Sequence, residues 1–349
     1  MSSLQNSLAL VGGLTLIGVV LYNLWTARQN APRQAAPETS GTGTDPVLHD
    51  SEAEAKGPQD PTFLEDAIDI LHVPEKKPPL DALIDVIASI EVDSQVSGDA
   101  ALAALPTTRR VGTKPFAVEG LNDTTGEWET PLPGHRYHAF QAGVQLANRV
   151  GALNDIEFSE FVIKAQAFAD SVNGAPEFPD MLEEVARARE LDQFASEHDA
   201  QLSFTIVATA AAWSPGYIQQ HAARWGFVAG VIPGRMVLAA PVQGLPPILS
   251  LSFDSQAAMA DDPALSAIRE FTLSLDVPQV LREENAFARL REAARILGGE
   301  MDGLITDGAG HALSEAELNA IAADLEHLYD ALDRRELSAG SPQARRLFS

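Results

Sequence analysis

The sequence predicts an α+β protein with antiparallel sheets covered by helices on one face, in two tandem divergent copies, preceded by one transmembrane helix. Three observations carry this prediction. Segments that alternate apolar and polar residues, typical of half-buried strands, stand between amphipathic segments with a helical period. Their order in residues 80–199 is similar to that in residues 200–338, which favours an internal duplication. The third observation is an uncharged apolar stretch at the start of the chain.

This apolar stretch is "SLALVGGLTLIGVVLYNLW", residues 7–25, and no charged residue precedes Arg28. Roughly 20 apolar residues in a helix span the hydrocarbon core of a bilayer. Tyr22 and Trp25 stand where aromatic rings favour the membrane interface. We therefore predict a transmembrane anchor over residues 1–26. A signal peptide and a buried core helix are the alternatives, but a signal peptide requires a positive n-region and a small-residue cleavage site.

Basic residues follow the apolar stretch and none precedes it. They are Arg28, Arg33, Lys56, Lys76 and Lys77. The positive-inside rule places the side that carries them in the cytoplasm, so we expect the N-terminus on the other side and the bulk of the chain in the cytoplasm. The absence of cysteine agrees with this orientation, because extracytoplasmic proteins often carry disulfides.

The composition argues against nucleic acid as a partner. The 349 residues include 49 acidic and 24 basic side chains, for a formal net charge of −25. Nucleic-acid binding needs a basic surface that neutralises phosphates. An acidic surface also repels anionic lipid, so membrane attachment is expected to depend on the anchor.

Residues 27–79 are predicted to be a flexible tether, because they are rich in Pro, Ala, Gly, Ser and Thr and poor in large apolar groups. Such a segment cannot bury enough surface to offset its ordering entropy. One amphipathic piece interrupts it, "TFLEDAIDILHV", residues 62–73. Its apolar residues fall roughly on one face: Phe63, Ala67, Ile68, Ile70 and Leu71. The piece either docks on the globular part or forms a transient helix.

The first module is predicted over residues 80–199. Strands are expected at 83–92, 114–122, 126–130 and 138–147, and helices at 98–105, 155–174 and 179–199. The second module is predicted over residues 200–338. Its strands are expected at 204–211, 235–241, 248–253, 271–278 and 302–307, and its helices at 214–226, 283–299 and 313–333. Residues 339–349 are expected to be a disordered tail.

Capping residues support the helix boundaries. Asp155 is the expected N-cap of its helix and Gly174 the expected stop. Ser214 precedes a proline at the first helical position. Ser314 and Glu317 have the spacing of a capping box.

The predicted strands are apolar on one face only, as a sheet with helices on one side requires. The opposite face carries small or polar side chains: Gln141, Gln145, Ser250, Ser252, Thr272 and Ser274. One broad face of each sheet is therefore either exposed to water or covered by a partner.

Catalytic and metal-binding motifs are missing from the sequence. There is no phosphate-binding loop, no G-x-S-x-G elbow, no paired histidine motif and no cysteine. Asp302 and Asp307 are five residues apart and do not match a calcium-binding loop. We predict a protein that is not an enzyme and has no metal, cofactor or small-molecule substrate. A membrane-bound enzyme with a site between the two modules is an alternative, which a cluster of buried carboxylates or histidines there would favour.

Two regions of the chain carry a family resemblance. The first is the uncharged N-terminal span followed by "TARQ", and the second comprises "QLSFTIVATAA", "RWGFVAG", "PPILSLSFD", "FTLSLDVP" and "AFARLREAARILGGEMDGLITDGAGHALSEAELNAI" in the second module. Together they resemble the ZipA family, the membrane anchors of the bacterial division ring. The resemblance covers residues 1–25 and 201–333, and it implies the fold of the family's C-terminal domain. The first module occupies a region where the family has a linker.

The resemblance implies a protein-binding site on the exposed sheet face of the second module. In the family this face binds the C-terminal tail of the tubulin-like protein FtsZ in a shallow apolar groove. Carried over strand by strand, the site comprises Phe204, Ile206, Ile232, Ser252, Asp254, Thr272 and Ser274. At Ser252, Asp254 and Ser274 the family has larger apolar side chains.

These expectations combine into one functional hypothesis. The chain is a single-pass protein of the bacterial inner membrane, with a periplasmic N-terminus. Its cytoplasmic module binds the FtsZ tail, links the Z ring to the membrane and so takes part in septation. The alternative is a membrane-tethered adaptor or scaffold of the same fold with another protein partner.

Overall fold

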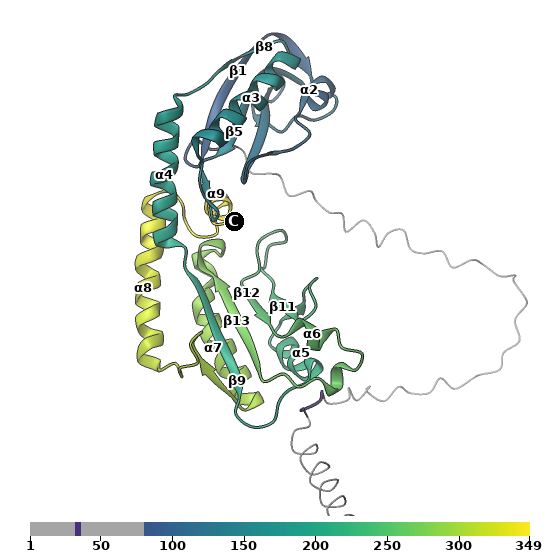
Figure 1. Ribbon diagram of the computed structural model, residues 1–349, viewed down its shortest axis with the longest axis vertical. Helices are drawn as coiled ribbons and strands as arrows, with labels where there is room; N and C mark the ends of the chain where they lie inside the picture. Colours follow the sequence, from purple (N-terminus) through teal and green to yellow (C-terminus); the bar gives the residue numbers. More distant parts are fainter. Residues whose placement is uncertain (1–31, 36–79) are drawn as a thin grey trace, which may run out of the picture.

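The computed structural model describes residues 32–35 and 80–349. These residues form two antiparallel sheets with packed helices, so the α+β class is confirmed (Figure 1). In the described part of the chain no helix has the length and apolarity needed to cross a membrane. The predicted anchor, residues 1–26, lies outside the described residues, as does the amphipathic piece at 62–73.

The first sheet has the strand order β2-β3-β5-β1-β8, with β4 paired to β3. Its strands are β1 (Asp85–Ser97), β2 (Arg110–Val111), β3 (Lys114–Asn122), β4 (Trp128–Glu129), β5 (Arg136–Gln145) and β8 (Gly174–Glu177). A short hairpin of β6 (Ala147–Asn148) and β7 (Gly151–Ala152) follows β5. The helices are α2 (Gly98–Ala104), α3 (Asp155–Ser171) and α4 (Met181–His198).

The second sheet has the strand order β10-β11-β12-β13-β9-β14. Its strands are β9 (Gln201–Ala208), β10 (Val228–Ala229), β11 (Arg235–Leu238), β12 (Leu249–Ser252), β13 (Glu270–Asp276) and β14 (Gly303–Thr306). The α-helices are α5 (Pro215–Arg224), α6 (Ser255–Ala258), α7 (Ala286–Met301), α8 (Glu315–Arg334) and α9 (Pro342–Leu347). Three short 3-10 helices lie at Pro263–Leu265, Val277–Gln279 and Arg282–Glu284.

The two sheets share a strand order. In the first, β3-β5-β1-β8 are neighbours, and in the second, β12-β13-β9-β14 are neighbours in the corresponding positions. In the first sheet, β1 is the first strand of its module and lies between β5 and β8. In the second sheet, β9 is the first strand of its module and lies between β13 and β14. The long helices are α3 and α7, and each leads directly into the edge strand β8 or β14.

Most predicted strands and helices are present, but one cap differs. Asn154, not Asp155, caps α3, because the Asn154 side chain accepts hydrogen bonds from the backbone N–H groups of Ile156 and Glu157. The Glu157 carboxylate accepts the Asn154 backbone N–H in return, which completes a capping box. The helix ends at Ser171, a left-handed Asn173 (φ 52°) follows, and Gly174 begins β8. The capping box of Ser314 is confirmed.

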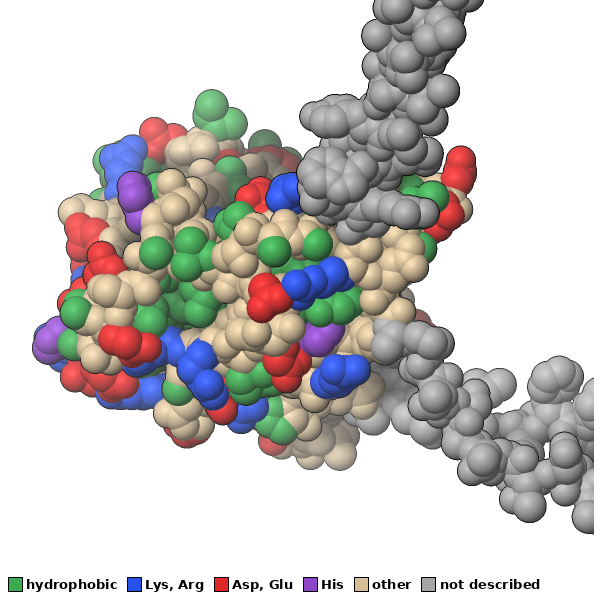
Figure 2. All heavy atoms as spheres, turned by 90° about the horizontal axis from the view of Figure 1, so that it is seen from below, with side chains coloured by type: hydrophobic (Ala, Val, Ile, Leu, Met, Phe, Trp, Pro, Cys, Tyr) green, Lys and Arg blue, Asp and Glu red, His purple; other side chains and the backbone are tan. Residues whose placement is uncertain are grey.

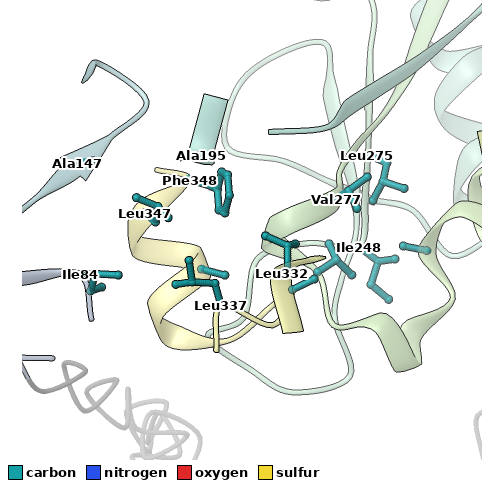
Figure 3. Close-up of a cluster of buried hydrophobic side chains, with 14 of the residues drawn as sticks. Ile84, Ala147, Ala195, Ile248, Leu275, Val277, Leu332, Leu337, Leu347 and Phe348 are labelled. Atoms are coloured by element: carbon teal, nitrogen blue, oxygen red, sulfur yellow. The ribbon is translucent and has the colours of Figure 1, made fainter. Parts of the chain in front are cut away.

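The prediction of a disordered tail at residues 339–349 is wrong. Residues 342–347 form α9, and Leu347 and Phe348 are fully buried. Figure 3 shows both side chains between Ile84 and Ala147 of the first module and a group from the second that includes Val277. The composition of the tail, with two arginines and little apolar content, hid this packing. The helix is stabilised by contacts with residues that are distant in the sequence, and local sequence patterns do not predict such contacts.

Polar contacts also join the two modules. The Arg346 guanidinium donates to the buried Asp85 carboxylate at 2.5 Å. Arg149 donates to Asp199 at 2.6 Å and to Asp276 at 2.7 Å. Partial burial lowers the pKa of Arg149, but its hydrogen bonds to the two carboxylates outweigh this effect and raise the pKa. Further along the junction, Arg335 of the segment after α8 bonds to Glu190 of α4 at 2.8 Å.

Part of the predicted tether is docked on the second module. The Arg33 backbone N–H donates to the carbonyl of Ala212 at 2.7 Å, and the Arg33 carbonyl accepts from the N–H of Ser214 at 2.9 Å. Its guanidinium donates to the Asp302 carboxylate at 2.5 Å. The two backbone bonds form an isolated parallel β-bridge between Arg33 and Trp213. Charges of both signs are interspersed over the pole of the molecule seen in Figure 2. The prediction of a flexible tether over residues 27–79 is thus wrong at residues 32–35.

Candidate protein-binding face of the second sheet

The two apolar residues predicted for the open face of β9 belong to the core. Phe204 is 3% exposed and Ile206 is fully buried. In the register of β9 and β13, Phe204 lies opposite Leu273 and Ile206 opposite Phe271. Side chains opposite one another point to the same face of a sheet. The prediction is therefore wrong by one residue along the strand, and the open face of β9 carries the residues at 201, 203, 205 and 207.

Hydroxyl groups dominate the middle of the open face. One row across the strands contains Ser250, Ser274 and Ser203, and the next contains Ser252, Thr272 and Thr205. A groove of about 720 Å³ lies over these rows. It is lined by the three serines of the first row, by Ser252 and Thr272 of the second row, and by Ile232 and Arg235. We call it the sheet groove. The structure thus brings together Ser252, Thr272, Ser274 and Ile232 of the predicted site.

Asp254 is not part of the sheet groove. Its carboxylate caps the short helix α6 by accepting the backbone N–H of Gln256 at 2.8 Å. The neighbours Phe253 and Ser255 contribute to the lining of the groove instead. The family resemblance assigned Asp254 to the site together with Ser252, but β12 ends at Ser252 and Asp254 lies beyond the strand.

A tight turn holds Ile232 at the rim of the groove. Proline and glycine follow it, and the N–H of Arg235 donates to the Ile232 carbonyl at 3.1 Å. Gly234 has φ 76°, and a Cβ there would lie 2.7 Å from the carbonyl oxygen of Phe253. Only glycine fits this turn without strain. Val231 and Ile232 are consequently presented to solvent, with Val231 fully exposed and Ile232 at 55%.

Arg235 places a positive charge on this face of a very acidic protein. It starts β11 and lies opposite Ser252, on the open side of the sheet. Within the described residues, its guanidinium makes no ion pair or hydrogen bond. By contrast, Arg149, which lines the neighbouring hollow described below, forms ion pairs with two carboxylates. An unpaired guanidinium beside hydroxyl groups suits a carboxylate.

A second hollow continues the sheet groove toward the first module. Its volume is about 550 Å³, and we call it the junction hollow. Its apolar lining consists of Val231, Ile232, Val237, Pro246, Pro247, Ile248 and Phe348. Arg149, from the loop between β6 and β7 of the first module, closes one side. The two hollows share Ile232, Arg235, Ser250, Ser274 and Asp276, so they form one continuous surface.

The junction of the modules contains a buried carboxylate, Asp85, that lies outside both hollows. Burial raises the pKa of the Asp85 carboxyl, and the ion pair with Arg346 offsets only part of this effect. Its bonds to Arg346 and to the backbone N–H of Asp81 give it a structural role at the start of β1. Within residues 32–35 and 80–349, no group of three or more potential metal ligands comes together.

Four residues that line this surface were not predicted from the sequence: Arg235, Arg149, Val237 and Phe348. One signal was available in "GVIPGR", where two large apolar residues precede a Pro-Gly turn. Apolar residues at such a turn are either packed inward or exposed for contact with a partner. Arg149 and Phe348 could not be found in this way, because they reach the hollow through the arrangement of the two modules.

Comparisons with known proteins add little to this description. No family model matches the sequence, and no curated protein matches it. Among solved structures, a similarity is found to the berberine bridge enzyme from Eschscholzia californica, with 9% sequence identity and a TM-score of 0.16. The match covers 74% of this chain and about half of that enzyme, at 54%. A similarity this low supports no inference about fold or activity.

Proposed function

We propose that the protein is a membrane-anchored, non-catalytic component of the bacterial division apparatus whose second module binds the C-terminal tail of FtsZ. The proposal rests on the resemblance of residues 1–25 and 201–333 to the ZipA family. The single structural observation that supports it is the open face of the second sheet, where an exposed Ile232 flanks a groove large enough for a peptide. In this proposal the protein links the Z ring to the inner membrane.

The two modules, we infer, derive from a duplication of one ZipA-like unit. The shared order of β3-β5-β1-β8 and β12-β13-β9-β14 supports this inference. The first module contributes Arg149 to the junction hollow. Its role is therefore to complete the binding surface of the second.

The partner is bound weakly in this proposal, with a dissociation constant on the order of 10 μM or higher, because a hydroxyl-lined groove buries little apolar area. The same groove favours the second candidate function, a membrane-tethered adaptor for another protein. Ser203, Ser250 and Ser274 offer hydrogen bonds rather than apolar contact. A partner that presents polar groups at these positions would fit them as well as an FtsZ tail does.

A pull-down distinguishes the two functions. Fragment 80–349, immobilised at its N-terminus because Phe348 and Ser349 line the junction hollow, is incubated with purified FtsZ and with FtsZ lacking its C-terminal tail. Retention of intact FtsZ alone supports the proposal. Equal retention of both forms, or of neither, removes tail binding and leaves the adaptor.

A further inference from the structure

The junction hollow is an apolar surface on an acidic chain, and its occupant can be argued from this chain itself. Val231, Ile232 and Pro246 contribute apolar atoms to it, and Arg235 contributes a positive charge that has no ion-pair partner in the part of the chain that the structure describes. A fitting ligand is therefore a short segment with large apolar side chains and carboxylates. The amphipathic piece at residues 62–73 has both.

The piece matches the hollow in charge. It carries Glu65, Asp66 and Asp69, and no Lys or Arg occurs between Lys56 and Lys76. Arg235 lies where the hollow meets the sheet groove and has no carboxylate partner among the described residues. An Arg–carboxylate pair is among the stronger hydrogen-bonded contacts at a partly buried site.

The length of the chain allows the contact. Residues 74–79 separate the piece from Leu80, which is about 20 Å of extended chain. The next residue, Asp81, accepts a hydrogen bond from Gln343 of α9 at 2.8 Å. Helix α9 is about 9 Å long, and Phe348 and Ser349 at its end line the hollow. The described chain thus resumes beside the hollow, within reach of the piece.

We propose that residues 62–73 bind in the junction hollow of the same molecule, with the apolar face formed by Phe63, Ile68 and Leu71 on Val231 and Ile232, and a carboxylate on Arg235. A tether this short holds the piece at an effective concentration of about 1 mM or more, so a weak contact suffices. The docking does not depend on the proposed function. One consequence does rest on it: Ile232 and Arg235 also line the sheet groove, so the docked piece competes with an FtsZ tail.

The absence of cysteine makes a cross-linking test specific. The full chain, purified in detergent micelles, carries Ile68→Cys with Val231→Cys and is treated with a short bismaleimide. The matched control carries Ile68→Cys with Leu304→Cys, since Leu304 is 48% exposed on β14, at the opposite edge of the same sheet. Both substituted sheet-side residues are exposed, so neither change threatens the fold.

We expect the Val231→Cys pair to cross-link within one molecule at least tenfold faster than the control, at a rate independent of protein concentration. Arg235→Gln should slow that reaction at least threefold, because the carboxylate loses its partner. Equal rates in the two pairs, an unchanged rate with Arg235→Gln, or cross-links formed only between molecules would each overturn the proposal. FtsZ is absent from the experiment, so failure here is separate from failure of the tail-binding hypothesis.

Discussion

At the scale of single residues, Phe204 shows how one position decides between core and binding site. Its ring lies edge-on to Phe287 of α7 at 6.3 Å between ring centroids. We expect Phe204→Ala to lower the free energy of unfolding by about 3–5 kcal/mol, the cost of a cavity in a packed core. Thr205→Ala, on the open face, should change it by less than about 0.5 kcal/mol. Denaturant unfolding of both variants provides the test, and a Phe204→Ala variant as stable as the parent would place the ring outside the core.

The Asp85 carboxyl gives stability a predictable pH dependence. Its pKa is raised in the folded state by burial. The folded state therefore binds this proton more tightly than the unfolded state, and the contribution to stability is largest below the unfolded pKa of about 3.9. It is lost as the pH rises through the folded pKa. Relative to Asp85→Asn, the parent should gain stability as the pH falls from 7 toward 4, as followed by thermal unfolding. A gain in the opposite direction would refute the assignment.

At the scale of elements, an ion pair between Arg33 and Asp302 adds to the backbone hydrogen bonds that dock residues 32–35. Asp302 has a left-handed backbone with φ 53°, which asparagine also tolerates. Asp302→Asn should therefore keep the end of α7 intact while it weakens the bond to Arg33. We expect trypsin to cleave after Arg33 several-fold faster in this variant. Cleavage after Arg28 in the same chain is the control, and an equal acceleration at both sites would show that the ion pair does not hold the segment.

Sequence patterns predicted the long elements of both sheets because their information is local. Alternation placed Phe140, Ala142 and Val144 inward in β5, and all three are fully buried. The short strands β8 and β10 were missed, because two to four residues carry no period and owe their conformation to pairing with β1 and β11. The facing of β9 was wrong for a related reason. Its sequence is apolar at Leu202, at Ile206 and at the adjacent Val207, so register with β13 had to decide between its faces.

At the scale of the whole molecule, α9 connects the two modules. Leu347 is fully buried between them, next to the ion pair of Arg346 with Asp85. We expect Leu347→Ala to lower the free energy of unfolding by about 2–5 kcal/mol. Truncation after Gly340 should separate the unfolding of the modules into two calorimetric transitions, because the contacts that couple them are removed. A single unchanged transition in the truncated chain would mean that other contacts, such as Arg335 with Glu190, suffice.

The arrangement of the modules also determines which part of the candidate site could be predicted. Alternation of apolar and polar residues along β12 and β13 was enough to predict which hydroxyl side chains lie on the open face of the sheet. Ser252, Thr272 and Ser274 do lie on that face. Arg149 and Phe348 reach the same surface from elsewhere in the chain. The contribution of these two residues could not be predicted from the sequence, because their positions depend on how the second module packs against the first and against α9.

The most direct test of the account is calorimetric titration of fragment 80–349 with a synthetic FtsZ tail peptide. We predict binding on the order of 10 μM or weaker, and a loss of about 1–3 kcal/mol of binding free energy in Ile232→Ser, because interface energy concentrates in a few anchor residues that become buried on binding. Leu304→Ser, at the far edge of the same sheet, should bind like the parent. No detectable heat at millimolar peptide, or equal losses in both variants, would contradict the assignment of this face as an FtsZ-binding site.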